Sequence, residues 1–287
     1  MKEKYIIEGK DNFNFKHIFE CGQCFRWNKD LDGSYVGVIN NGVLKAKEQN
    51  DKIIITGVCK ENLKNVVLDY FDLENDYDKI KNKLSVIDDN MKNSIKYGYG
   101  IRILHQDIWE MLISFIISAN NNIPRIKAII EKMSSTYGEK IIFENRTYYL
   151  FPTPEQLGKA SVEDLRKLGM GFRDKRVYET TKMVLKNKIN LYELENEPTD
   201  IVREKLLELP GVGPKVADCI MLFALKRYEV FPIDVWVRRV MNELYIKNID
   251  EEKVNKKELE HLAKEKYGDL AGLAQQYLFY WRREQGA

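Results

Sequence analysis

Short apolar runs separated by polar turns fill the first part of the chain and predict β-strands. Residues 35–39 and 43–47 flank Asn40-Asn41-Gly42, whose residue types tolerate positive φ and favour a hairpin turn. Residues 53–56 suit a further buried strand, and residues 60–73 predict a helix. This first part of the chain is therefore expected to hold strands and turns with one or two helices.

Beyond about residue 98 the apolar spacing becomes helical, and helices with short loops are expected throughout. One segment is apolar over most of its circumference, which is typical of a helix in the middle of a bundle. Its apolar residues include Trp109, Met111, Leu112, Phe115 and Ile116. Asn120-Asn121-Asn122 ends this helix, because asparagine competes for backbone hydrogen bonds, and Pro124 starts the next. Short helices are expected at 154–157 and 161–168, the latter with a Ser161 cap.

These patterns predict an α+β fold in two parts. An N-terminal antiparallel β-sheet subdomain at residues 1–97 would pack on an all-α helix–hairpin–helix body at residues 98–287. The body would contain two helical subdomains with the active site between them. The 287 residues are enough for two or three packed subdomains.

Composition narrows the class of protein only slightly. Hydrophobic residues make up 44% and charged residues 31% of the chain, which is ordinary for a globular protein. The formal net charge of +2 gives no overall sign of a nucleic-acid partner. Basic residues gather at 166–176, 238–239 and 282–283, which fits either solvated helix faces or a phosphate-binding surface.

Cysteine and histidine positions give no metal-binding pattern. Cys21 and Cys24 have the spacing of a metal-ligand pair, but no second pair follows, and the three histidines lie far apart. The N-terminus has no apolar signal region, and no run approaches the length of a membrane span. We therefore expect a reduced, cytoplasmic protein without a metal.

The segment at residues 206–219 carries the clearest functional signal. A helix is expected to end at Leu209, a tight turn with Gly211 and Gly213 follows, and Pro214 takes the favoured first position of a second helix. Such a helix–hairpin–helix exposes backbone N–H groups that suit a phosphate oxygen and read no base sequence. A plain αα-hairpin is the alternative.

Two side chains near this turn are candidates for chemistry. Lys215 lies in the first turn of the second helix, where the helix dipole and partial burial favour the neutral amine that can attack carbon. An ordinary solvated lysine is the alternative. Asp234 precedes a helix and is expected to be its N-cap. A rigid carboxylate there would also stabilise a developing oxocarbenium ion or move protons.

These two residues lie in segments that resemble the helix–hairpin–helix glycosylase superfamily, namely Leu-Pro-Gly-Val-Gly-Pro-Lys215 followed by Pro-Ile-Asp234. Four further segments resemble the 8-oxoguanine DNA glycosylase family first known from eukaryotes. They are Gly22-Gln23-Cys24-Phe25-Arg26-Trp27, Ser118-Ala119-Asn120-Asn121-Asn122-Ile123-Pro124-Arg125, Leu168-Gly169-Met170-Gly171-Phe172-Arg173 and Ala271-Gly272-Leu273-Ala274-Gln275-Gln276-Tyr277-Leu278-Phe279. The resemblance spans about residues 20 to 280.

The resemblance implies a bifunctional enzyme that removes 8-oxoguanine from duplex DNA. The damaged base would flip out of the stack, and Lys215 would attack C1′ to form a Schiff base, with Asp234 as its essential partner. β-Elimination would then nick the strand. No metal or organic cofactor is required, and the enzyme is expected to be a monomer that acts at the nucleoid of a prokaryotic cytoplasm.

The resemblance also implies the residues that bind the damaged base. The Gly22 carbonyl would accept a hydrogen bond from N7–H of 8-oxoguanine, a proton that guanine lacks. Cys219, which lies four residues after Lys215 and on the same helix face, would sandwich the base together with Phe279. Gln275 would meet its Watson–Crick edge.

Further residues would handle the DNA around the lesion. Asn120, Arg125 and Arg173 would serve the orphaned opposite base, Phe172 would wedge into the stack, and the turn at Gly211 and Gly213 would bind phosphate. Two positions depart from the eukaryotic pattern: Trp236 stands where a histidine is usual, and Phe172 where a tyrosine is usual.

Two other functions fit parts of the sequence. The first is a sister glycosylase with another substrate, such as alkylated bases or oxidised pyrimidines. Alkyl-base members generally lack the lysine, and iron–sulfur members carry four closely spaced cysteines near the C-terminus. This sequence has the lysine and lacks those cysteines. A non-catalytic helix–hairpin–helix DNA-binding module would explain the hairpin but not Lys215 with Asp234.

Overall fold

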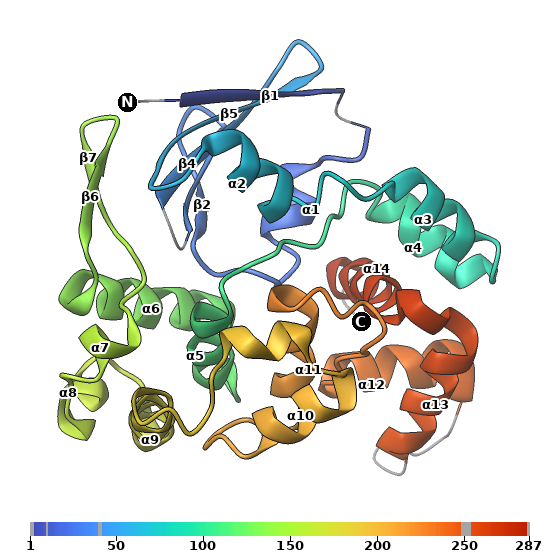
Figure 1. Ribbon diagram of the computed structural model, residues 1–287. Helices are drawn as coiled ribbons and strands as arrows, with labels where there is room; N and C mark the ends of the chain where they lie inside the picture. Colours follow the sequence, from blue (N-terminus) through green and yellow to red (C-terminus); the bar gives the residue numbers. More distant parts are fainter. Residues whose placement is uncertain (1–2, 10, 40–41, 248–253, 286–287) are drawn as a thin grey trace.

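The computed structural model describes residues 3–9, 11–39, 42–247 and 254–285 (Figure 1). The strands are β1 (Glu3–Glu8), β2 (Trp27–Lys29), β3 (Tyr35–Ile39), β4 (Gly42–Gln49), β5 (Lys52–Cys59), β6 (Lys140–Phe143) and β7 (Arg146–Tyr149). The first helices are α1 (Phe15–Phe19), α2 (Leu63–Tyr70), α3 (Tyr77–Ser85), α4 (Asp89–Tyr97), α5 (Ile108–Ser118), α6 (Ile123–Tyr137) and α7 (Pro154–Leu157). The later helices are α8 (Val162–Lys167), α9 (Asp174–Leu185), α10 (Thr199–Leu207), α11 (Pro214–Ala224), α12 (Val235–Met241), α13 (Lys256–Tyr267) and α14 (Ala271–Glu284). Short 3-10 turns are η1 (Gly171–Arg173), η2 (Tyr192–Asn196) and η5 (Gly268–Leu270), and η3 (Asn242–Ile246) is a π-helical turn.

The N-terminal strands form one antiparallel sheet in the order β1-β5-β4-β3-β2. The pairing of Ile39 with Gly42 confirms the predicted hairpin, although its turn residues Asn40 and Asn41 lie outside the described residues. Helices α1 and α2 cover one face of the sheet (Figure 1). Trp27 lies in this core, stacked on Phe19 with ring centroids 3.9 Å apart.

A second hairpin, β6–β7, lies against the other face of the sheet. Phe143 and Leu150 form a buried cluster with Val36, Val38 and Val43 of the sheet. The prediction of helices alone beyond residue 98 is wrong for this segment. Its apolar run is too short to show a period, and the signal for strands is a turn at residues 144–145, where φ is 46° and 61°.

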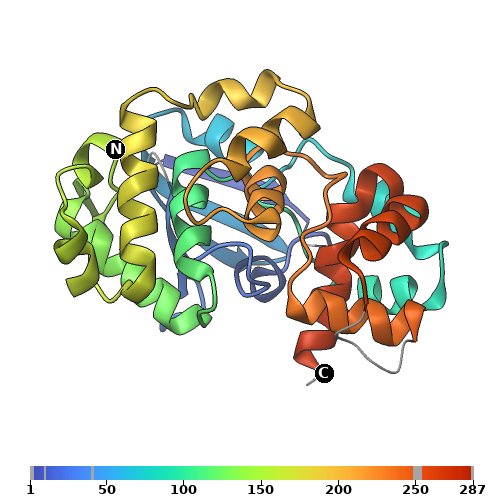
Figure 2. The same ribbon diagram turned by 90° about the horizontal axis from the view of Figure 1, so that it is seen from below.

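Among the described residues before residue 98, the structure has four helices rather than the predicted one or two. Helix α4 packs against the C-terminal helix α14, and α3 packs on α4, so this pair lies away from the sheet (Figures 1 and 2). Met91 and Ile95 of α4 belong to the same buried cluster as Tyr277 of α14. The proposed division of the chain between residues 97 and 98 stays a prediction.

Helix α5 lies in the middle of the helical body, as its apolar circumference predicts (Figure 2). It is bounded by polar side chains: Asp107 caps its N-terminus, and Asn122 caps the next helix, α6. Asn120, in the turn between α5 and α6, has φ 50°, a conformation that asparagine tolerates. The predicted Ser161 cap of α8 is confirmed as a capping box with Asp164.

The helix predicted at residues 60–73 is shorter in the structure, where α2 spans Leu63–Tyr70. Asn62 caps its start by accepting from the N–H groups of Lys64 and Asn65. Its end is set by a tight turn, in which Asp72 has φ 52°. Asparagine and aspartate at these positions favour caps and turns over helix interior.

We expect Gly37→Ala to destabilise the sheet. A methyl group on Gly37 would overlap the ring of Trp27, which is 1% exposed and donates to the Tyr70 hydroxyl at 2.8 Å. Overpacking of this kind typically costs about 1–3 kcal/mol. Urea unfolding measures the loss, with Gln49→Ala on the exposed end of β4 as the control. A change in unfolding free energy equal to that of the control would show that the ring moves aside freely.

Candidate active site

The first helix of the helix–hairpin–helix, α10, ends at Leu207, two residues before the predicted end at Leu209. Leu209 precedes Pro210, and a residue before proline is disfavoured in helical conformation. The chain instead turns through two tight hydrogen bonds, Leu209 N–H to Leu206 O at 3.2 Å and Val212 N–H to Leu209 O at 3.0 Å.

The hairpin turn requires glycine at its tip. Gly211 has φ 88°, and a methyl group there would lie 3.0 Å from the side chain of Arg176. Gly213 is the N-cap of α11 and Pro214 its first residue, as predicted. The first N–H groups of a helix have no partner within it, and glycine has no side chain to cap them, so this end suits a phosphate.

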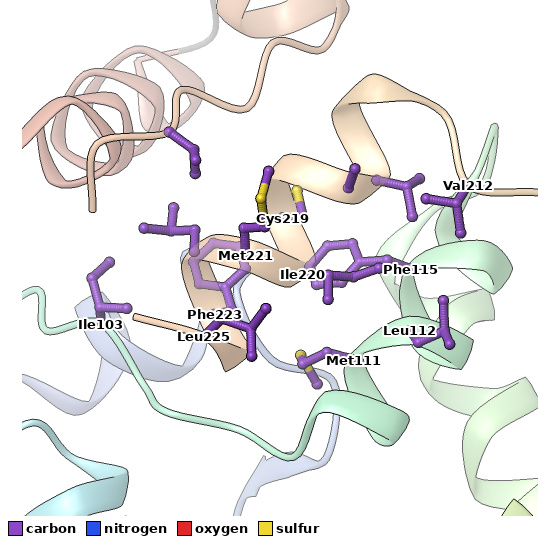
Figure 3. Packing of buried hydrophobic residues seen from close by; sticks show 14 of the residues in the cluster. Ile103, Met111, Leu112, Phe115, Val212, Cys219, Ile220, Met221, Phe223 and Leu225 are labelled. Atoms are coloured by element: carbon purple, nitrogen blue, oxygen red, sulfur yellow. The ribbon is translucent and has the colours of Figure 1, made fainter. Parts of the chain in front are cut away.

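Lys215 lies in the first turn of α11, half-buried. Its Nζ lies 5.0 Å from the centroid of the Phe115 ring on α5. Phe115 in turn stacks on Phe223 of α11, with ring centroids 5.8 Å apart and planes 13° apart. Figure 3 shows this aromatic packing beside Cys219 of α11. The two central helices therefore form one side of a pocket with the amine at its rim.

Asp234 is the N-cap of α12, which confirms that expectation. Its Oδ1 accepts from the N–H of Val237 at 2.8 Å. The carboxylate is half-buried, and the cap holds it in one position.

One pocket gathers every residue predicted for catalysis and for binding the damaged base. They are Gly22, Lys215, Cys219, Asp234, Gln275 and Phe279. They come from the segment after α1, from α11, from the start of α12 and from α14. The volume of about 50 Å³ is far below the roughly 300–1,000 Å³ of typical ligand pockets. A purine therefore enters only after side chains move.

The walls of this pocket are mostly neutral. Burial raises the pKa of the Cys219 thiol to about 11, against an opposing effect of Lys215, so it remains a neutral, polarisable thiol at neutral pH. Gly22 has φ 93°, and a methyl group there would lie 3.5 Å from Arg283 and 3.8 Å from Phe279. These are ordinary contact distances, so the positive φ, rather than lack of space, is what favours glycine at this position.

The residues predicted for the opposite base form a second group. The Arg173 guanidinium, 2% exposed, donates to the carbonyls of Ala119 and Asn120 at 2.6–2.8 Å and so holds the Asn120 turn. Arg125 is exposed and donates to Gly169 O at 3.2 Å. Phe172 is 55% exposed, with the Arg173 guanidinium 4.2 Å from its ring centroid. Their roles on DNA stay predictions.

Sequence reasoning missed several residues that line the pocket. The sequence pattern places Phe115 in the core and indicates no role in the site for Phe223, Cys21 or Pro232. Gln276 also lines the pocket and is 5% exposed. Its signal in the sequence is a second amide beside Gln275 in an otherwise apolar part of a helix.

No metal site or membrane span is found in the part of the chain that the structure describes. Its acidic, histidine and cysteine side chains form no group of three or more that could hold a metal ion. None of its helices is long and apolar enough to cross a membrane.

Comparison with known proteins gives matches over nearly the whole chain. Residues 113–266 match the family of HhH-GPD superfamily base excision DNA repair proteins, and residues 5–112 match the N-terminal domain of 8-oxoguanine DNA glycosylase. A probable N-glycosylase/DNA lyase of Methanothermobacter thermautotrophicus is 33% identical, over 75% of this chain and 72% of the relative. The N-glycosylase/DNA lyase of Saccharomyces cerevisiae is 31% identical, over 94% of this chain and 83% of the relative.

A solved structure with the same fold is the Clostridium acetobutylicum 8-oxoguanine glycosylase/lyase in complex with double-stranded DNA containing cytosine opposite 8-oxoG. It is 40% identical with a TM-score of 0.93, covering 100% of this chain and 99% of that one. The hairpin and the lysine pocket thus define a base excision repair protein of the HhH-GPD class. Within that class, the chain belongs to the 8-oxoguanine DNA glycosylase family, which confirms the resemblance of its motifs.

Two replacements of Asp234 should separate the effect of its capping hydrogen bond on stability from the effect of its charge. Asp234→Ala removes the acceptor for the Val237 N–H and should lower the free energy of unfolding by about 1 kcal/mol. Asp234→Asn keeps a capping oxygen and should stay within a few tenths of a kcal/mol of wild type. Chemical denaturation measures both. An equal loss in the two variants would mean that the charge, not the cap, stabilises α12.

Proposed function

We propose that this protein excises 8-oxoguanine from duplex DNA and then cleaves the strand at the resulting abasic site. The observation that carries the proposal is the convergence of Lys215, Asp234 and the base-binding residues on one pocket. Membership of the family supports it, because relatives bear the name N-glycosylase/DNA lyase. Since the substrate is DNA, we place the activity at the nucleoid of a prokaryotic cell.

The base must leave the double helix before it reaches the pocket, because its edge and C1′ are buried in the stack. The small pocket then opens, and Phe279, which is half-buried at its mouth, is the ring that moves to cover one face of the base. Cys219 covers the other face as a neutral thiol. All these side chains come from one copy of the chain, so a monomer suffices.

The reaction begins with Lys215 Nζ attacking C1′ through its lone pair. The new C–N bond replaces the bond between C1′ and N9, and the base leaves with its electron pair and takes up a proton. Asp234, held by its cap, stabilises the positive charge that develops on the sugar. Opening of the sugar ring and loss of the amine proton give an imine. Removal of a C2′ proton then expels the 3′ phosphate and nicks the strand.

Selectivity against guanine rests mainly on the carbonyl of Gly22. It accepts a hydrogen bond from N7–H, which exists only in the oxidised base. Guanine presents a lone pair at N7 instead, and leaving a buried acceptor unpaired costs roughly 1–3 kcal/mol. The positive φ of Gly22 sets the direction of this carbonyl, which explains why glycine is needed.

The DNA around the lesion is held at two places. The hairpin at Gly211 and Gly213 binds a backbone phosphate through N–H groups. Phe172 fills the stack, while Arg125, Arg173 and Asn120 serve the orphaned base. Arg173 also fixes the turn that presents Asn120, through its bonds to backbone carbonyls.

Borohydride should trap Lys215 on DNA that carries one 8-oxoguanine, because the imine is reduced to a stable amine. Lys215→Gln should abolish the cross-linked species, seen as a shifted band on a denaturing gel. Asp234→Asn should slow single-turnover excision by a far larger factor than it weakens DNA binding. Cross-linking by Lys215→Gln at wild-type yield would rule out this lysine as the nucleophile.

Excision should be faster opposite cytosine than opposite adenine. Cytosine presents the acceptors O2 and N3 to arginine donors, whereas adenine turns its N6 amino donor towards them, at a cost of a few kcal/mol. The preference for cytosine should be weaker than in family members with tyrosine at this position, because Phe172 has no hydroxyl to fix its surroundings. Four duplexes that differ in the opposing base measure the ranking for wild type and Arg125→Ala.

The control for charge is Lys159→Ala, which removes an exposed lysine after α7. It should keep the wild-type ranking, while Arg125→Ala should flatten it. A ranking that Arg125→Ala leaves untouched would assign Arg125 to a phosphate instead of the opposite base.

A further inference from the structure

Two neighbouring amides lie inside the pocket on α14. Gln275 and Gln276 are 4% and 5% exposed, and both line the pocket. The Nε2 of Gln276 donates to the Oε1 of Gln275 at 2.6 Å. This bond fixes the orientation of both amides, because it uses the Nε2 of Gln276 and the Oε1 of Gln275.

The remaining oxygen of Gln276 has nothing to bind. Within the described part of the chain, no donor lies within hydrogen-bonding distance of its buried Oε1. Most buried polar groups are paired, so an orphan inside a binding pocket points to a partner supplied by the ligand. The aromatic and proline side chains that share this pocket, Phe115, Phe223 and Pro232, offer no N–H or O–H.

The proposed substrate has donors that fit this arrangement. The Watson–Crick edge of 8-oxoguanine carries N1–H and, next to it, the 2-amino group. Gln275 Oε1 already accepts one hydrogen bond and has one lone pair left. Two adjacent donors on the base therefore require two adjacent acceptors, and a single glutamine oxygen does not supply them.

We propose that Gln276 is a specificity-determining residue whose Oε1 accepts from the 2-amino group of the flipped base, while Gln275 Oε1 accepts from N1–H. The inference rests on the proposed excision of 8-oxoguanine and deepens it. It makes the pocket selective for purines that carry a 2-amino group. An oxidised purine without that group leaves the Gln276 oxygen unpaired in the closed pocket, which slows its excision.

The test compares 8-oxoguanine with 8-oxohypoxanthine, which differs only in lacking the 2-amino group. Each is placed opposite cytosine in the same duplex, and single-turnover excision rates are measured. Wild type should prefer 8-oxoguanine by about tenfold, as expected for one buried hydrogen bond. Gln276→Met, of similar length but without an acceptor, should slow 8-oxoguanine excision and leave 8-oxohypoxanthine within about twofold, so that the preference collapses.

Gln49→Met makes the same chemical change on the exposed end of β4 and should keep the wild-type ratio. Gln276→Ala also removes the acceptor without the risk of overpacking, so it replaces Gln276→Met if that variant does not fold. Equal rates for the two bases in wild type, or a folded Gln276 variant that slows both bases equally, would overturn the proposal. A wild-type protein that releases neither base would instead reject the proposed function itself.

Discussion

The buried side chain of Gln23 joins the recognition segment to the helical body, and the site depends on this junction. Its amide is fully buried and makes three hydrogen bonds of 2.8–2.9 Å, with Ile18 O, Arg102 O and Leu104 N–H. The Gln106 amide donates to the Gln23 carbonyl at 2.9 Å. Gly22, the preceding residue, is thereby fixed relative to the segment that leads into α5. Because α5 carries Phe115 at one end of the pocket and the Asn120 turn beyond it, one amide aligns two parts of the site that lie far apart in sequence.

Residues with special backbone chemistry are the part of the site that sequence could predict. Glycine at the hairpin tip, proline at the start of α11 and aspartate before α12 are each dictated by local conformation, and local conformation is readable from a few residues. Their order along the chain, together with Lys215, identifies the family. The six residues of the pocket followed from that resemblance, whereas no periodicity or spacing brings four distant segments together.

What sequence could not predict depends on long-range contacts. The β6–β7 hairpin is stabilised by Val36 and Val38 on a sheet about a hundred residues earlier. The sequence gives no sign that the Arg173 guanidinium also donates to backbone carbonyls of the turn after α5. Gln276 gave a signal, a polar residue in an apolar helix, but its meaning comes from Gln275 and from the pocket wall opposite. In each case the structural role of the residue depends on contact partners that its local sequence does not reveal.

The pocket chemistry argues against a protein that merely binds DNA. A helix–hairpin–helix that holds phosphate needs only the N–H groups at Gly211 and Gly213 and an exposed surface. It does not require a half-buried lysine against the Phe115 ring, a buried neutral thiol, or two amides at 4–5% exposure. An unpaired buried oxygen such as Gln276 Oε1 costs stability, and inside a pocket a ligand donor can offset that cost. The polar interior of this pocket therefore favours the proposed flipped base, which carries its own donors, and Lys215 favours the proposed chemistry on the sugar of that base.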